Sequence, residues 1–344
     1  MTKIDIISGF LGAGKTTLIK KLLSEAFKGQ QVVLIENEFG EIGIDGGFLK
    51  EAGIQIREMN SGCICCSLVG DFGVSLKEVI GTYHPDRIII EPSGVGKLSD
   101  VIRAVEDVKE DCDLELNSFT TVADVTKCKM YLRNFGEFFK NQLEYANTII
   151  LSRMDKASQE KTDKAVELIR EINRDASLIT TPITQLDGGK ILEVMEKRTQ
   201  SIEEMELPHE HGHHHEHEHH HDGECNCGHD HHHDGECSCG HDHHHEHGHH
   251  HADEVFTSWG RETARKFERT ELEKMLEMLG DGETFGMVLR AKGILEGTDG
   301  AWYYFDMVPG EAEIRTGEAD YTGRLCVIGS GLKEEELEKL FGLA

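Results

Sequence analysis

The chain has 344 residues, enough for two ordinary domains, and 38% of them are hydrophobic, which can support a buried core. The formal net charge is −28 with His counted as neutral. This charge argues against nucleic-acid binding, because nucleic-acid binders usually carry a basic surface, and we interpret the acidic excess as a solubility feature.

The N-terminal segment "MTKIDIISGF" does not resemble a signal peptide, because its apolar part is short and runs directly into a glycine-rich loop. No apolar run approaches the ~18 residues that a membrane helix needs, so we expect no membrane partner. We therefore expect a cytoplasmic protein with reduced thiols. Its ten cysteines are better read as metal ligands or core residues than as disulfides.

Residues 1–200 alternate strand-like and helix-like segments. Strands are predicted at 3–8, 31–38, 86–94, 118–125 and 146–155, and helices at 15–27 and 159–176. This alternation predicts an α/β domain with a mainly parallel sheet covered by helices.

The stretch "GFLGAGKTT" follows the first strand, opens the first helix and fits the phosphate-loop pattern G-x-x-x-x-G-K-[ST]. The glycines let backbone N–H groups surround phosphate oxygens, and the helix N-terminus favours negative charge. Lys15 can neutralise the β- and γ-phosphates, and the Thr16 hydroxyl can hold Mg²⁺. The expected nucleotide-binding residues are Gly9, Gly12, Ala13, Gly14, Lys15, Thr16 and Thr17. The alternative is a chance glycine turn.

A companion acid is predicted at the end of a neighbouring strand, where "IIIEPSG" supplies Glu91. Glu91 could bind Mg²⁺ through water or polarise the attacking water. We therefore predict Lys15, Thr16 and Glu91 as the catalytic residues. The alternative for Glu91 is an ordinary surface acid at a strand end.

Specificity for the nucleotide base is predicted from "IILSRMD", which ends in Asp155. A carboxylate there can accept two hydrogen bonds from the guanine N1–H and 2-amino group. The familiar GTPase pattern has Asn or Thr, then Lys, before this Asp, whereas this chain has Ser152 and Arg153. Arg153 could still stack on the base, so we favour GTP over ATP.

The stretch "NSGCICCS" places Cys63, Cys65 and Cys66 within four residues. The C-x-x-C spacing suits either a metal ion or a redox dithiol, and core packing is a third possibility. Cys65 between the pair favours metal, because a third thiolate converges on the same point. Three thiolates suit Zn²⁺, Co²⁺, Ni²⁺ or Cu⁺.

From His209 to His251 the chain is almost entirely His, Asp, Glu, Gly and Cys, and "DGECNCGHDHHH" is followed at once by "DGECSCGHDHHH". We expect residues 201–253 to be a disordered linker or lid. Neutral imidazoles bind metal, and thiolates are added by Cys225, Cys227, Cys237 and Cys239. This composition predicts a metal reservoir, the alternative being a plain solvated linker.

Residues 254–344 are predicted to form a small α+β domain of about 90 residues. Helices are expected at 262–280 and 333–342, and strands at 285–295, 301–308, 311–317 and 324–329. Outside the Cys-rich motifs, lone cysteines are commonly buried small hydrophobes, which is the expectation for Cys112, Cys128 and Cys326.

The motifs "GFLGAGKTT", "ENEFGEIGID", "NSGCICCS" and "EPSG", in that order, resemble those of the CobW-type metallochaperone GTPases, of the family that includes HypB and UreG. The resemblance extends to the C-terminal segment through "VLRAKGIL" and "CVIG". It implies a P-loop GTPase that binds GTP and Mg²⁺, holds a transition metal at Cys63, Cys65 and Cys66, and delivers it to a client metalloprotein. It also makes Glu36–Glu41 the first switch segment, in which Glu36 or Glu41 completes or relays the metal site.

The residues support a switch independently, because a polar segment directly after an apolar strand can be ordered by a γ-phosphate and released on hydrolysis. The alternative for Glu36 and Glu41 is loop solvation. We therefore expect a GTP-hydrolysing metallochaperone, with Zn²⁺ favoured and Co²⁺ or Ni²⁺ possible, whose C-terminal domain contacts the client. Alternatives are a metal-storage protein that uses the His-rich segment and a metal-sensing regulator. The sequence makes no prediction of oligomeric state.

Overall fold

The structure, a computed structural model, describes residues 1–37, 55–59, 69–109, 111–197 and 252–343. The chain divides into two units, Met1–Leu207 together with His251–Ala344, and Pro208–His250. The second unit lies wholly outside the described residues, so the predictions for the His-rich segment are not addressed by the structure. The same holds for the predictions on Glu41, Cys63, Cys65 and Cys66.

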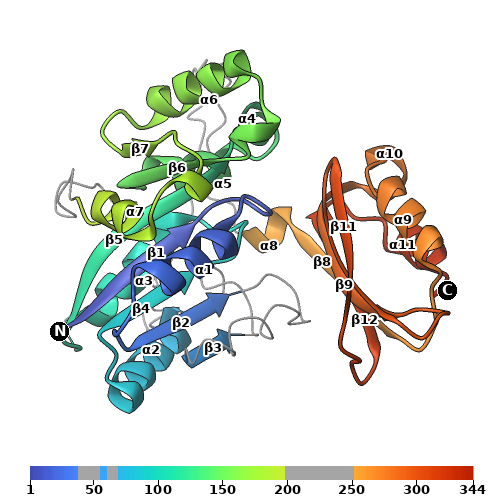
Figure 1. Cartoon of the computed structure of the whole chain (residues 1–344), viewed down its shortest axis with the longest axis horizontal. Helices are drawn as coiled ribbons and strands as arrows, with labels where there is room; N and C mark the ends of the chain where they lie inside the picture. The colour runs from blue at the N-terminus through green and yellow to red at the C-terminus, as the bar shows by residue number, and fades with distance from the viewer. Residues whose placement is uncertain (38–54, 60–68, 110, 198–251, 344) are drawn as a thin grey trace, which may run out of the picture. The chain divides into compact units, whose positions relative to one another are not determined.

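The first sheet has seven strands in the described part of the chain, in the order β3-β2-β4-β1-β5-β6-β7 (Figure 1). The strands are β1 (Thr2–Ser8), β2 (Val32–Asn37), β3 (Gln55–Met59), β4 (Arg87–Glu91), β5 (Leu114–Asp124), β6 (Thr148–Ser152) and β7 (Ser177–Ile179). All of their pairings are parallel. The predicted parallel α/β fold is confirmed.

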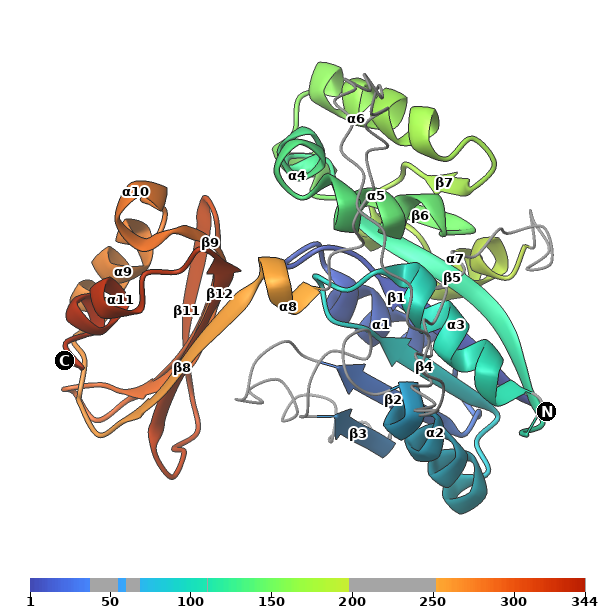
Figure 2. The same ribbon diagram turned by 180° about the vertical axis from the view of Figure 1, so that it is seen from behind.

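Helices cover both faces of this sheet (Figures 1 and 2). They are α1 (Lys15–Glu25), α2 (Val69–Tyr83), α3 (Leu98–Lys109), α4 (Cys128–Asn134), α5 (Gly136–Glu144), α6 (Gln159–Ile172) and α7 (Gly188–Met195), with the 3₁₀ turns η2 (Met154–Lys156) and η3 (Ile183–Gln185). Helices α1 and α7 share one core with Leu34 and Ile89, whereas α2, α3 and α5 share the other with Ile35 and Ile90. Successive strand residues therefore face opposite helical layers.

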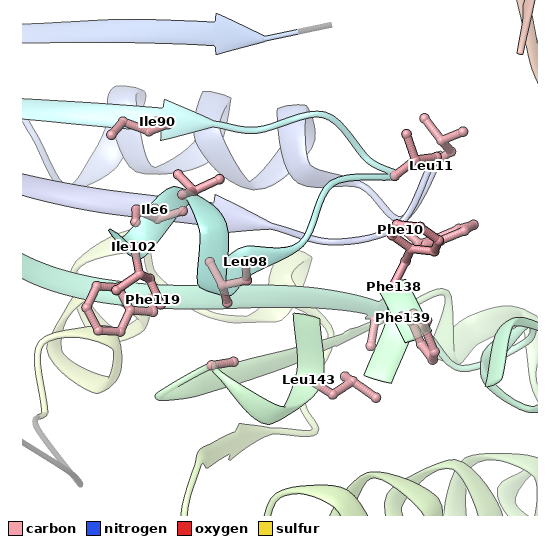
Figure 3. Close-up of a cluster of buried hydrophobic side chains, with 14 of the residues drawn as sticks. Ile6, Phe10, Leu11, Ile90, Leu98, Ile102, Phe119, Phe138, Phe139 and Leu143 are labelled. Atoms are coloured by element: carbon pink, nitrogen blue, oxygen red, sulfur yellow. The ribbon is translucent and has the colours of Figure 1, made fainter. Parts of the chain in front are cut away.

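The core on the α3 side is shown in Figure 3, where Ile6 and Ile90 of the sheet lie beside Leu98 and Ile102 of α3. Because both faces are covered, the central strands are continuous apolar runs instead of alternating patterns. That property made "IDII" and "RIII" recognisable as strands in the sequence.

The second sheet has five strands in the described residues, in the order β11-β10-β9-β12-β8, and all of its pairings are antiparallel. The strands are β8 (Thr257–Thr263), β9 (Met287–Glu296), β10 (Trp302–Val308), β11 (Glu311–Gly317) and β12 (Gly323–Ser330). The accompanying helices are α8 (Ala252–Val255), α9 (Arg269–Met278), α10 (Gly282–Phe285) and α11 (Glu334–Phe341). The predicted α+β character of this part is confirmed.

One predicted element is partly wrong. The helix expected at 262–280 begins only at Arg269, because Thr257–Thr263 pair with β12 as strand β8. Trp259 is buried in the second core from this strand, so tertiary packing determines its conformation. Strand β5 also begins at Leu114, earlier than expected, because Leu114–Leu116 pair in parallel with Thr2–Ile4 of β1.

Of the three lone cysteines, two are buried as predicted and one is only partly buried. Cys128 and Cys326 are buried in the first core, and Cys112 is partly buried against it. Within the described residues, every helix is too short or too polar to cross a membrane.

Candidate nucleotide site

The predicted phosphate loop joins β1 to α1 through backbone that favours glycine. Gly9, Gly12 and Gly14 have φ values of 143°, 70° and 105°, a region that side chains with a Cβ rarely adopt. A Cβ on Gly9 would also lie 2.4 Å from the Val122 carbonyl oxygen. The loop therefore turns sharply at the N-terminus of an eleven-residue helix, which forms a cradle of the kind that binds phosphate.

The three residues predicted to be catalytic are brought together. Lys15 is buried and its Nζ donates to the Gly9 carbonyl oxygen over 3.1 Å. The same Nζ lies 3.9 Å from Glu91 Oε1. Thr16 Oγ1 donates to Glu91 Oε1 over 3.2 Å. Loop, helix and the end of β4 thus converge on one point.

The donor set at this point fits Mg²⁺, which prefers oxygen ligands and usually takes only one or two carboxylates with substrate phosphates. The Thr16 hydroxyl and the Glu91 carboxylate would hold the ion directly or through water. Thr17 lies exposed in the first turn of α1, and its predicted role in nucleotide binding stays a prediction.

The segment after Glu91 packs tightly against the phosphate loop. A Cβ on Gly94 would lie 2.9 Å from the Leu11 backbone nitrogen, so only glycine fits without a shift. The fully buried Gln142 of α5 donates to the carbonyl oxygens of Gly94 and Gly96 over 3.2 and 2.8 Å. Sequence reasoning missed Gln142, since a glutamine in a helix carries no local sign of such a role.

The predicted base-recognition loop follows β6. Ser152 ends the strand, and Arg153 has a left-handed φ of 55°. Asp155 lies exposed in η2, and its predicted contact with guanine stays a prediction. Arg153 Nη2 donates to the Gly12 carbonyl oxygen over 3.1 Å, and its Nε lies 3.3 Å from Asp124 Oδ2. Arg153 therefore ties this loop to the phosphate loop.

Asp124 was also missed from the sequence, although its position carries a signal. It ends β5 as Glu91 ends β4, and both follow apolar strands of the parallel sheet. Its side chain is almost fully buried and also accepts from the backbone and hydroxyl of Thr126. The buried Asp124 carboxylate therefore holds Arg153 of the base-recognition loop through an ion pair.

The predicted metal residues divide into described and undescribed groups. Glu36 is buried near the end of β2, in register with Glu91 of the adjacent β4. Residues in register on parallel strands share a face, so Glu36 lies on the α1 side, as Glu91 does. Among the described residues, no group of three or more His, Cys, Asp or Glu side chains is placed to hold a metal ion.

The chain matches a family model over much of its length. The family model described as "CobW/HypB/UreG, nucleotide-binding domain" matches residues 3–180, which is more than half of the chain. The chain belongs to the CobW/HypB/UreG family. A second model, the "Cobalamin synthesis protein cobW C-terminal domain", matches residues 256–343 of this family member. The resemblance drawn from the four motifs is confirmed.

Two curated relatives of this CobW/HypB/UreG family member have names that refer to zinc. The chain is 29% identical over 188 residues to "Zinc chaperone YeiR" of Escherichia coli (strain K12), covering 55% of this chain and 57% of that protein. It is 28% identical over 322 residues to "Zinc-regulated GTPase metalloprotein activator 1" of Schizosaccharomyces pombe, covering 89% and 74%. The match to YeiR thus spans less than two thirds of that relative.

A solved structure similar to this chain is the crystal structure of Zn(II)-bound YjiA GTPase from E. coli. The two share 21% identity with a TM-score of 0.44, over 99% of this chain and 98% of the other.

Proposed function

We propose that the protein hydrolyses GTP with Mg²⁺ and uses this cycle to bind a transition metal and deliver it to a client protein. The names of two relatives, a zinc chaperone and a zinc-regulated GTPase metalloprotein activator, support zinc as the favoured cargo. Co²⁺ and Ni²⁺ use the same ligand types and are alternatives.

The observation that carries this proposal is that β3, which precedes the thiol motif in the sequence, belongs to the same parallel sheet as β1, which precedes the phosphate loop. In a parallel sheet the carboxyl ends of neighbouring strands lie together. The loop after β1 holds phosphate, and Glu91 ends β4. Strand β3 ends at Met59, and Cys63 follows four residues later in the sequence. The strands that precede the two motifs in the sequence therefore end at the same edge of one sheet, which supports coupling between nucleotide and metal.

In the proposed hydrolysis, Lys15 and the backbone N–H groups of the loop bind the β- and γ-phosphates and stabilise charge on them. Glu91 holds and orients the attacking water. Asp155 accepts hydrogen bonds from the N1–H and 2-amino group of guanine. Arg153 stacks on the base, and Ser152 ends the preceding strand. Mg²⁺ held by Thr16 would neutralise phosphate charge.

In the proposed metal cycle, Cys63, Cys65 and Cys66 bind the cargo ion, and Glu36 or Glu41 completes or relays the site. Glu36 is the residue through which nucleotide and metal binding would communicate, because it lies in register with Glu91 and is the first residue of the predicted switch segment. A tenfold change in metal affinity needs only about 1.4 kcal/mol of difference between nucleotide states.

The His-rich segment would gather metal through its imidazoles and through Cys225, Cys227, Cys237 and Cys239. Its internal repeat also favours a second candidate function, which is metal storage. Deleting residues 209–251 separates the two functions. A delivery protein keeps one tight nucleotide-dependent site after this deletion, whereas a storage protein loses nearly all of its metal binding.

The thiols are tested by counting tight Zn²⁺ sites in the full chain with a competing chelator, in the presence of Mg²⁺ and a non-hydrolysable GTP analogue. The Cys65→Ala variant should lose one tight site relative to the wild type. Cys112→Ala is the matched control, because Cys112 lies far from the motif in sequence, and should retain it. An unchanged count in Cys65→Ala would remove the thiols from the mechanism.

A further inference from the structure

A hairpin of the second sheet contacts the base-recognition loop of the first. Glu311, the first residue of β11, follows the turn at Pro309 and Gly310. Lys156 Nζ lies 2.6 Å from Glu311 Oε1, and Arg153 Nη1 pairs with Oε2 of the same carboxylate. A single carboxylate therefore holds two cations, which precede and follow Asp155 in the sequence.

These pairs extend a line of alternating charges from the protein interior to the surface. Asp124 is 2% exposed, Arg153 23% and Glu311 42%. Arg153 also donates to the Gly12 carbonyl oxygen, so it contacts three separate segments. Because the left-handed backbone of Arg153 is unfavourable for a residue with a Cβ, contacts from outside the loop help to fix its conformation.

Two further contacts connect the C-terminal part of the chain, residues 252–343, to the phosphate loop. The buried Val308 occupies the space that a Cβ on Gly12 would need, with Cγ1 only 2.4 Å from that position. Phe256 packs against Phe10 of the loop, with ring centroids 6.2 Å apart. The approach of the Glu311 hairpin to the nucleotide site is therefore supported by apolar packing as well as by charge.

We infer that Glu311 is a positioning residue for nucleotide binding, which acts by holding Arg153 and Lys156, the cations before and after Asp155 in the sequence. The inference rests on the proposed function, in which residues 152–155 read guanine. It assigns the second sheet a direct part in nucleotide affinity.

Charge favours this role because the carboxylate is ionised at neutral pH. The hydrogen bond from Lys156 lowers the pKa of Glu311, although partial burial opposes the shift. Isolated surface ion pairs contribute little. Glu311, however, bridges two cations, one of which is itself held by a buried carboxylate and a backbone carbonyl.

The test measures affinity of the full chain for fluorescent GDP and for a GTP analogue with Mg²⁺. Glu311→Gln keeps the shape but removes the charge, and should weaken both nucleotides about fivefold while kcat at saturating GTP stays unchanged. Glu311→Asp should recover part of the loss. Glu313→Gln, an exposed acid on the same strand, is the matched control and should bind as the wild type does.

A double variant identifies the route of the effect. If Glu311 acts through the loop, combining Glu311→Gln with Lys156→Met should weaken binding less than the product of the two single effects. Affinity within twofold of the wild type in Glu311→Gln, tighter binding, or fully multiplicative effects would each overturn the inference.

An Asp155→Asn variant separates failure of the inference from failure of the proposed function. This substitution should shift preference from guanine to xanthine nucleotides, because it exchanges an acceptor for a donor. If that shift occurs while Glu311→Gln is neutral, only the inference fails. If the shift does not occur, the assignment of residues 152–155 to guanine fails.

Discussion

Thr16 donates its hydroxyl hydrogen bond to Glu91 over 3.2 Å, which joins the first turn of α1 to the end of β4. The carboxylate also faces Lys15 Nζ at 3.9 Å. One acid thus contacts both residues that the phosphate-loop pattern assigns to Mg²⁺ and to phosphate.

Replacing this acid by Glu91→Gln should reduce GTP hydrolysis at least about 100-fold, because general-base and water-orienting groups typically contribute that much. Nucleotide affinity should change by less than about threefold. The kcat for phosphate release measures the effect. Glu160→Gln, an exposed acid at the start of α6, is the control and should retain activity. Equal rates for the two variants would remove Glu91 from the chemistry.

The contact between Gly12 and Val308 predicts a specific stability loss. Gly12→Ala should lower the free energy of unfolding by about 1–2 kcal/mol through backbone strain, because φ is 70°. Overpacking of the new Cβ against Val308 should lower the free energy of unfolding by a further amount of about 1–3 kcal/mol. Gly29→Ala is the matched control, since φ is 82° there but a Cβ meets nothing within 4 Å.

Urea denaturation of the two alanine variants measures the difference. A Val308→Ala substitution should recover stability in the Gly12→Ala background and lose it in the wild-type background. Equal denaturation midpoints for Gly12→Ala and Gly29→Ala would contradict the packing of Val308 against the phosphate loop.

A buried ion pair joins the middle of β1 to the first residue of β4. Asp5 is fully buried, pairs with Arg87, and accepts from Asn117 and Ser118 over 2.8 and 2.6 Å. Asp5→Ala should destabilise the fold by about 3–5 kcal/mol, because it leaves the Arg87 charge without this partner. Asp113→Ala is the exposed control, expected within about 0.5 kcal/mol of the wild type. A small effect of Asp5→Ala would show that water replaces the carboxylate.

Burial raises the pKa of the Cys128 thiol to about 12. Because the thiolate is the reactive form, Cys128 should stay protonated and resist iodoacetamide in the native protein from pH 7 to 9. It should react fully after unfolding in denaturant. Peptide mass spectrometry follows the labelling, with the partly exposed Cys112 as an internal reference that reacts first. Rapid native labelling of Cys128 would contradict its burial.

The sequence was most informative where chemistry demands a fixed local pattern. The phosphate loop needs particular glycines and a lysine between a strand and a helix, so Lys15 and Thr16 could be predicted to lie together. Glu91 followed from its place at the end of an apolar strand. The structure brings these three residues together as predicted.

Residues that act through tertiary contacts could not be found this way. Gln142 reaches the carbonyl of Gly94 across 48 positions of sequence, and Glu311 reaches Arg153 across 158. Neither has a local sequence pattern that distinguishes it from other polar residues. Strand β8 was missed for a related reason, since Thr257–Thr263 are held by pairing with the distant β12.

The central claim is that the nucleotide and the cargo metal affect each other's binding. The most direct measurement is a competition titration of Zn²⁺ on the full chain with the nucleotide site empty, filled with GDP, or filled with a non-hydrolysable GTP analogue and Mg²⁺. We predict one tight site whose Kd differs at least tenfold between the GDP and GTP-analogue forms. The same Kd in all three forms would contradict the account.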